Sequence, residues 1–244
     1  MSCPKLATCV LALSFVASTF FGGGSGIARD MKAIADRTYM NAKALGELCN
    51  GSSPDTVPIP KIRTSEGRKA FCQGYISGVG DVWDRKTAVG DWLYCLPKGV
   101  SPDELASAFT TSLRRDSYRL SRTSISVIAH GFSEAYPCTS DAKGSPSIGT
   151  ISLSELHSSC DNTADEAIFS VCWGYMIGVA DALYKSPSGA LVSSCYVDWR
   201  KSYEGIDRAW RLALTVMDLM TDAREGEPAV GVVASALHSS MPCP

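Results

Sequence analysis

Apolar side chains recur at helical spacing in several segments of the chain, whereas no segment alternates apolar and polar residues over the length of a β-strand. From residue 30 to 48 they fall on one face of a predicted helix that ends near Cys49. A second predicted helix begins at Thr64 or Ser65, with Glu66 in its first turn, where the helix dipole favours an acid. This pattern predicts an all-α protein.

Two more helices follow in the first half of the chain. Ser101, Pro102 and Glu104 supply an N-cap, a first-turn proline and a capping box, which together indicate a helix start. The fourth predicted helix runs from about Ser121 to a stop at Pro137–Cys138.

The second half of the chain shows the same four elements after a linker rich in Gly, Ser and Pro. Capping boxes are predicted to open its first two helices, at Ser152/Glu155 and Thr163/Glu166. A third helix is predicted from about Ser202 to Thr221, and Pro228 fits the first position of a last helix.

One motif occurs in both halves, in the second predicted helix of each. FCQGYISGVGDVW, at residues 71–83, returns one hundred positions later as VCWGYMIGVADAL, at residues 171–183. The cysteine, both spaced glycines, the tyrosine, a valine and the aspartate keep their places. Two tandem four-helix units are therefore predicted. The predicted division is residues 29–139 for the first domain, 140–150 for the linker and 151–244 for the second domain.

The N-terminus is typical of a secretory signal peptide. It has one positive charge, Lys5, then an uncharged apolar run that is too short and wrongly flanked for a spanning helix, and then small residues. Residues 1–28 are predicted to be removed, and no later stretch approaches the length of a transmembrane segment. The net charge of −2 offers no basic footprint for nucleic acid. The sequence thus predicts a soluble, exported protein without membrane insertion.

Eight cysteines remain after the signal peptide, four in each half, which for small exported units predicts a disulfide framework. Zinc binding is the competing interpretation, but no CxxC occurs and the three histidines are not at ligand spacing. In an up-down bundle the end of the first helix lies near the start of the second, and the start of the third lies near the end of the fourth. The predicted bridges are Cys49–Cys72, Cys95–Cys138, Cys160–Cys172 and Cys195–Cys243.

Within the motif, Gly74 and Gly78 lie on one helix face and predict close packing against another helix or an aromatic ring. Tyr75 is expected to bury its ring with a hydrogen-bonded hydroxyl. Asp81 opposes the helix dipole, so we expect a buried hydrogen bond to the loop that follows, with a catalytic or partner-facing carboxylate as the alternative. The same holds for their counterparts in the second copy.

The motif Cys-x-Gly-Tyr-[Ile/Met]-x-Gly-Val-x-Asp, followed by further cysteines and a final Pro-Cys, resembles the Rap/Tai family of immunity proteins, which accompany type VI secretion effectors. The resemblance covers nearly all the mature chain as two divergent copies. It implies a small helical periplasmic protein that binds a cell-wall-degrading effector, often a peptidoglycan amidase, and blocks its active site. The tandem arrangement departs from the family, as does Tyr196–Val197 in place of Leu96–Pro97.

No GxSxG, HExxH or phosphate loop occurs, and no cysteine is left over as a nucleophile, so we expect neither catalysis nor a cofactor. The leading hypothesis is a periplasmic immunity protein whose partner is a cognate effector toxin. The alternatives are an HdeA-like periplasmic stress chaperone and a structural envelope adaptor.

Partner contacts are predicted in three exposed loops. The connection between the third and fourth helices is five residues longer in the second copy, and the resemblance implies that this charged loop can enter the cleft of the effector. Its counterpart in the first copy is basic and carries a tyrosine. Another candidate exposed loop carries Trp83, Trp92 and the charged residues Asp84, Arg85 and Lys86. The predicted partner-binding residues are Asp222, Arg224, Glu225, Glu227, Trp83, Arg85, Trp92 and Tyr118.

Overall fold

The computed structural model describes residues 40–54, 62–84, 92–115, 117–139, 149–183, 203–220 and 226–240. These residues form eight α-helices and one 3₁₀ helix, with no β-strand among them, so the predicted all-α fold is confirmed. The predicted signal peptide, most of the linker, Cys195 and Cys243 lie outside the described residues.

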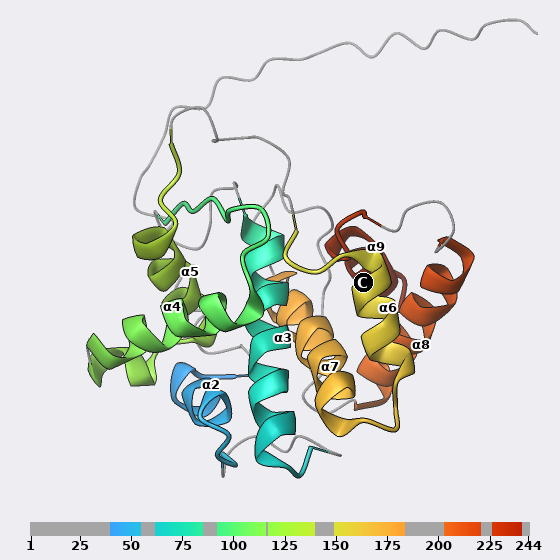
Figure 1. Cartoon of the computed structure of the whole chain (residues 1–244), viewed down its shortest axis with the longest axis horizontal. Helices are drawn as coiled ribbons and strands as arrows, with labels where there is room; N and C mark the ends of the chain where they lie inside the picture. Colours follow the sequence, from blue (N-terminus) through green and yellow to red (C-terminus); the bar gives the residue numbers. More distant parts are fainter. Residues whose placement is uncertain are drawn as a thin grey trace, which may run out of the picture.

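The helices of each half lie on their own side of a central pair, α3 and α7, which lie side by side (Figure 1). The first half consists of α2 (Ala42–Cys49), α3 (Ser65–Trp83), α4 (Pro102–Arg115), the 3₁₀ helix η1 (Ser117–Ser121) and α5 (Ser124–Ala135). The second half consists of α6 (Leu153–Asp161), α7 (Glu166–Leu183), α8 (Tyr203–Met220) and α9 (Val230–Ser240). Buried apolar side chains from both halves form one cluster.

Several helix starts lie where the sequence signals predict them. Thr64 caps α3, and the predicted capping box at Ser152/Glu155 opens α6. At α4, the Ser101 N–H donates to the Glu104 carboxylate, and the Glu104 N–H donates to the Ser101 hydroxyl, which completes the reciprocal box. These local signals are therefore retained in the tertiary structure.

Several predicted helix starts are wrong, among them that of α9, which begins at Val230 and not at Pro228. The helix predicted over residues 30–48 does not run through residue 41, because Asn41 has extended backbone and caps α2 with its side chain. Thr123 caps α5, so that helix begins at Ser124 and not near Ser121; the residues before it form η1. Glu166 forms no capping box with Thr163.

The start of α7 shows how one predicted cap was displaced. The Asp165 carboxylate accepts the N–H groups of Ala167 (2.9 Å) and Ile168 (3.1 Å), and so caps this helix. The Glu166 carboxylate turns to the first half instead and accepts hydrogen bonds from the N–H groups of Arg63 and Thr64, both at 2.7 Å. An acid from the second half thus satisfies backbone donors at the start of α3.

A glycine seam joins α3 to α7. A Cβ atom on Gly74 would overlap the carbonyl oxygen of Val171, and one on Gly78 would overlap that of Tyr175. The contacts are reciprocal, since a Cβ on Gly174 or Gly178 would overlap carbonyl oxygens of Phe71 or Tyr75, respectively. The two helices run parallel, with backbone against backbone. The predicted close packing is confirmed, and the element packed there is the other copy of the motif.

By length and composition α7 could cross a membrane, with a mean hydropathy of 1.3. The sequence, in contrast, predicts no transmembrane segment after the signal peptide. However, 78% of this segment is buried within the protein. Its apolar composition reflects contacts on several sides, with α3, α6 and α9.

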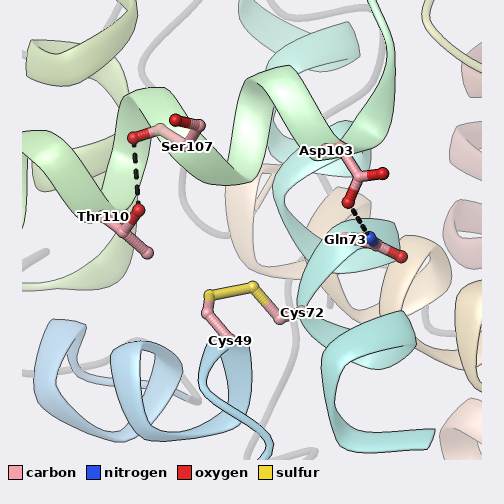
Figure 2. Close-up of a disulfide and its surroundings, with 6 residues drawn as sticks. All are labelled: Cys49, Cys72, Gln73, Asp103, Ser107 and Thr110. Atoms are coloured by element: carbon pink, nitrogen blue, oxygen red, sulfur yellow. Dashed lines mark hydrogen bonds between the residues drawn. A yellow bond between two sulfur atoms is a disulfide. The ribbon is translucent and has the colours of Figure 1, made fainter. Parts of the chain in front are cut away.

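Three of the four predicted disulfides are confirmed: Cys49–Cys72, Cys95–Cys138 and Cys160–Cys172. The predicted Cys195–Cys243 bridge lies outside the described residues. Figure 2 shows the first bridge, which ties the end of α2 to α3; the next residue along, Gln73, donates a hydrogen bond to Asp103 of α4 (2.5 Å). Adjacent residues of α3 therefore hold two neighbouring helices.

Candidate functional site

The tyrosines and aspartates of the repeated motif meet across the glycine seam. Tyr75 Oη donates to Asp181 Oδ2 (2.6 Å), and Tyr175 Oη donates to Asp81 Oδ2 (2.7 Å). All four side chains are buried. The predicted burial and hydrogen bonding are confirmed, but the expected bond to the following loop is replaced by a bond to the other half. With no exposed surface, these carboxylates do not face a substrate or a partner.

The surroundings of Asp81 shift its ionisation. Burial raises the pKa of Asp81 to about 7, although hydrogen bonds from Tyr175 and Thr150 oppose the rise. The Thr150 N–H donates to Asp81 Oδ1 at 2.7 Å. Burial also raises the pKa of Tyr175 well above its ordinary value, and the Asp81 charge adds to this effect. Asp81 thereby fixes both α7 and the segment that leads into α6.

The two halves differ beside these pairs. The Tyr75 hydroxyl also lies 2.7 Å from the hydroxyl of Ser124, which donates to the Met40 carbonyl at 2.8 Å. The corresponding position in the second half is Ala229: its N–H donates to the Ile151 carbonyl, as the Ser124 N–H donates to that of Met40. The first half therefore has a hydroxyl here that the second half lacks.

A groove of about 420 Å³ lies between α4 and α5 on the surface of the first half. The helices cross closely here, because Gly131 has no side chain and an added Cβ would lie 3.0 Å from the Ala108 carbonyl oxygen. Most of the residues that line the groove carry a hydroxyl or a charged group. The polar residues that line the groove are Glu104, Ser107, Thr111, Ser112, Arg115, Glu134 and Tyr136.

His130 lies beside this groove with a serine and a glutamate nearby, but the arrangement is not a catalytic triad. Its Nδ1 faces both Ser112 Oγ (3.4 Å) and Glu134 Oε2 (3.5 Å), whereas a triad base needs separate nitrogens for the nucleophile and the acid. Its Nε2 faces Arg119 (3.4 Å). Partial burial lowers the pKa of His130, and the Arg119 charge lowers it further. These contacts hold α4, η1 and α5 together.

The segment η1 places two apolar side chains in solvent. Tyr118 is 61% exposed and Leu120 is 40% exposed. The guanidinium of Arg122 lies 4.5 Å from the centre of the Tyr118 ring and donates to the Tyr118 hydroxyl at 2.7 Å. Tyr118 was predicted as a partner-binding residue, and the structure places it in an accessible position.

The other candidates of the first half are distributed differently. Trp92 is half-buried and packs edge-on against the His130 ring, with 5.2 Å between centroids, so His130 links it to Arg119 and η1. Trp83 is buried at the end of α3. Asp84 is buried too, and its carboxylate accepts the Leu96 N–H at 2.8 Å.

The prediction of an exposed loop is therefore wrong for Trp83 and Asp84. Both belong to the last turn and cap of α3, where the chain folds back on the core. Arg85 lies outside the described residues.

Of the predicted charged loop between the third and fourth helices of the second half, Asp222, Arg224 and Glu225 lie outside the described residues. Glu227 is described and exposed. Its carbonyl accepts the N–H of Leu153, the first residue of α6, just as the Arg122 carbonyl accepts the N–H of Ala42, the first residue of α2. Glu227 and Arg122 thus occupy equivalent positions in the two halves with opposite charge.

The sequence did not single out Arg119, Arg122 or Ser112 as residues that hold η1 in place. The basic composition of residues 115–122 was visible, but which arginines turn inward depends on tertiary contacts of α4 and α5. Across the described ranges, no three His, Cys, Asp or Glu side chains gather as metal ligands would.

No curated protein and no solved structure gives a significant match to the chain. A family model described as Rap1a immunity proteins matches residues 41–138, which span α2 to the end of the second disulfide. The match does not extend to the second half, which shares the repeated motif with the first. The first half of this protein is similar to the Rap1a immunity proteins, in agreement with the predicted resemblance.

Proposed function

We propose that this protein is a periplasmic immunity protein that binds a cognate type VI secretion effector, a peptidoglycan-degrading amidase, and blocks its active site. The observation that carries the proposal is the match of residues 41–138 to the Rap1a immunity proteins. It is supported by the disulfide-bonded helical scaffold, since disulfides persist in oxidising compartments such as the periplasm.

In this proposal the chain carries a signal peptide at residues 1–28 and two family-like domains, at 29–139 and 151–244. The seam makes them one rigid framework on which variable connections are displayed. The effector contacts come from Tyr118 and Trp92 in the first half and from Glu227 in the second, with Arg85, Asp222, Arg224 and Glu225 on adjoining segments. Trp83 acts from the core and supports the end of α3.

The two connections suit different parts of an effector. The first displays an aromatic ring with arginines, which is a composition typical of interface hot spots. The second carries Glu227 at the position equivalent to Arg122. This acid suits a basic or hydrogen-bond-donating surface. Contact through both would fix the orientation of the effector as well as its affinity.

The experiment is a binding and inhibition assay with a secreted peptidoglycan amidase of the same organism, whose gene the proposal expects to lie beside the gene of this protein. The mature protein, with its disulfides formed, should bind that amidase in a stoichiometric complex and stop peptidoglycan hydrolysis. Replacement of residues 222–227 by Gly and Ser should leave helicity unchanged and weaken the complex. Unchanged affinity would remove that loop from the interface.

The same assay separates the proposal from a chaperone role. An immunity protein binds one effector tightly and ignores unfolded clients. Suppression of aggregation of several unrelated proteins at low pH, without inhibition of any amidase, would overturn the proposed function.

A further inference from the structure

The middle of η1 is anchored inward by Arg119. Its guanidinium donates to the carbonyl oxygen of Ser112 at 2.9 Å and to the hydroxyl of the same buried residue. Its second terminal nitrogen lies 3.4 Å from His130 Nε2 on α5. One side chain therefore ties the short helix to both α4 and α5. The planar fork of arginine suits such a double contact.

The neighbours of Arg119 on either side face solvent. In the part of the chain that the structure describes, three large apolar side chains are clearly exposed; two are Tyr118 and Leu120, and the third is Ile168 on α7. Tyr118 and Leu120 take no part in the core cluster. Their apolar surface contributes nothing to the packing of the core. Such exposure, concentrated on one turn, is typical of a binding surface.

Contacts on the outer side hold the tyrosine as well. Arg122 stacks on the Tyr118 ring and donates to its hydroxyl, and the Ser121 hydroxyl donates to the Tyr118 carbonyl at 2.9 Å. Arg122 thus supports the ring, and Ser121 fixes the backbone that carries it. A side chain ordered before binding loses less conformational entropy when the complex forms.

The charge around this turn defines the partner. Arg122 and Arg114 are exposed, whereas Arg115 is paired with Glu134 at 2.9 Å. An aromatic and an aliphatic side chain flanked by cations fit an apolar pocket with carboxylates at its rim.

We infer that Arg119 is a positioning residue that holds Tyr118 and Leu120 in place to enter an apolar, acid-rimmed pocket on the effector. The inference rests on the proposed function. It adds the chemistry of the pocket on the effector and the residue, Arg119, that orders the binding turn before the complex forms.

The test uses calorimetry to measure the affinity of variants of the mature, oxidised protein for the purified amidase that the binding assay above identifies. Tyr118→Ala should weaken binding by roughly tenfold or more, and Arg122→Glu should weaken it most at low salt. Ile168→Ala and Arg208→Glu are the matched controls, since they change an exposed apolar side chain and an exposed arginine in the other half. Both should leave affinity within about twofold.

A double-mutant cycle tests the role of Arg119. If Arg119 acts through Tyr118, Arg119→Ala weakens binding in the native background and has little further effect when Tyr118 is already alanine. A structural role unrelated to the tyrosine would give additive losses and overturn the assignment. Should Arg119→Ala fail to fold by circular dichroism, Arg119→Lys replaces it, because lysine keeps the charge and loses the fork.

The outcomes for the two proposals are distinct. No complex between the unaltered protein and the amidase would overturn the proposed function and the inference with it. A tight complex that is indifferent to Tyr118→Ala, Leu120→Ala and Arg122→Glu would overturn the inference alone. If the unaltered protein and the two control variants bind tightly, and the variants at Tyr118, Leu120 and Arg122 do not, the result supports both the proposed function and the inference.

Discussion

The Tyr175 hydroxyl donates to the Asp81 carboxylate at 2.7 Å, across the seam between the two halves. Each partner comes from a different copy of the same motif, and the bond from Tyr75 to Asp181 repeats the arrangement. The motif therefore stabilises the protein by pairing with itself, as identical surfaces do in a two-fold symmetric dimer.

The buried carboxyl of Asp81 makes stability depend on pH. Its pKa is about 7 in the folded protein against an ordinary 3.8, so between these values the folded state binds the proton more tightly than the unfolded state. The free energy of unfolding should fall as pH rises from about 4 to about 7, by at most about 4 kcal/mol. Urea denaturation from pH 4 to pH 8 measures this slope.

Asp81→Asn cannot ionise and should flatten that pH profile. Asp161→Asn, at an exposed carboxylate of α6, is the control and should keep the slope of the native protein. An unaltered slope in Asp81→Asn would show that another group controls the pH dependence.

The glycine seam should not tolerate a methyl group. Gly174→Ala would force the added Cβ into the Phe71 carbonyl oxygen, so we expect the free energy of unfolding to fall by about 1–3 kcal/mol. Gly231→Ala is the matched control, because an added Cβ at this helical glycine of α9 meets no described residue within 4 Å beyond its chain neighbours and the backbone of its own helix. There alanine should be neutral or stabilise by up to about 1 kcal/mol through its helix propensity. Thermal unfolding of both variants compares the two sites.

Glu166 should stabilise α3 although it belongs to α7. Glu166→Ala removes the acceptor for the Arg63 and Thr64 N–H groups and should cost about 1 kcal/mol at neutral pH. Hydrogen bonds from Thr64 hold the pKa of Glu166 below 4.5, so its contribution is present above that pH and is lost on acidification.

Glu66→Ala alters an exposed acid in the first turn of α3 itself and provides the comparison. Chemical denaturation should show that Glu166→Ala loses more free energy of unfolding than Glu66→Ala at pH 7. At pH 3 the two variants should lose similar amounts. Equal losses for the two variants would mean that the bonds across the halves add nothing to the dipole effect.

Cys195 and Cys243 should form the fourth disulfide, by analogy with Cys95–Cys138 in the first half. Peptide mapping under non-reducing conditions should recover one fragment that contains both cysteines. Reduction of a bridge that closes a loop of this size should cost roughly 3–4 kcal/mol. Free thiols at these two positions would contradict the prediction.

Helix positions and disulfides were largely predictable because they depend on short-range signals. N-caps such as Thr64 and capping boxes such as Ser152/Glu155 act within one turn, and bundle geometry limits which cysteines can meet. The Thr163/Glu166 box failed because two acids competed for the same helix start. Asp165 caps α7, which leaves Glu166 to contact the other half.

Contacts between the halves were not predictable from one copy of the motif. Gly74 and Gly78 indicated a close neighbour, but only the fold shows that this neighbour is the second copy and that Asp81 bonds to Tyr175. The burial of the candidate binding residues was not predictable either. Tyr118 is exposed on a projecting turn, whereas Trp83 packs into the core, and tertiary contacts alone distinguish them.

The glycine seam lies within a single polypeptide, and this frees the protein from two constraints of a dimer. Pairing of the halves does not depend on the concentration of the protein, since the linker keeps them at an effective concentration on the order of millimolar. In a dimer of identical subunits every substitution also appears in both subunits, whereas in a single chain each half can be substituted independently. Arg122 and Glu227 therefore occupy equivalent positions with opposite charge, and each outer surface is able to diverge while the seam stays fixed.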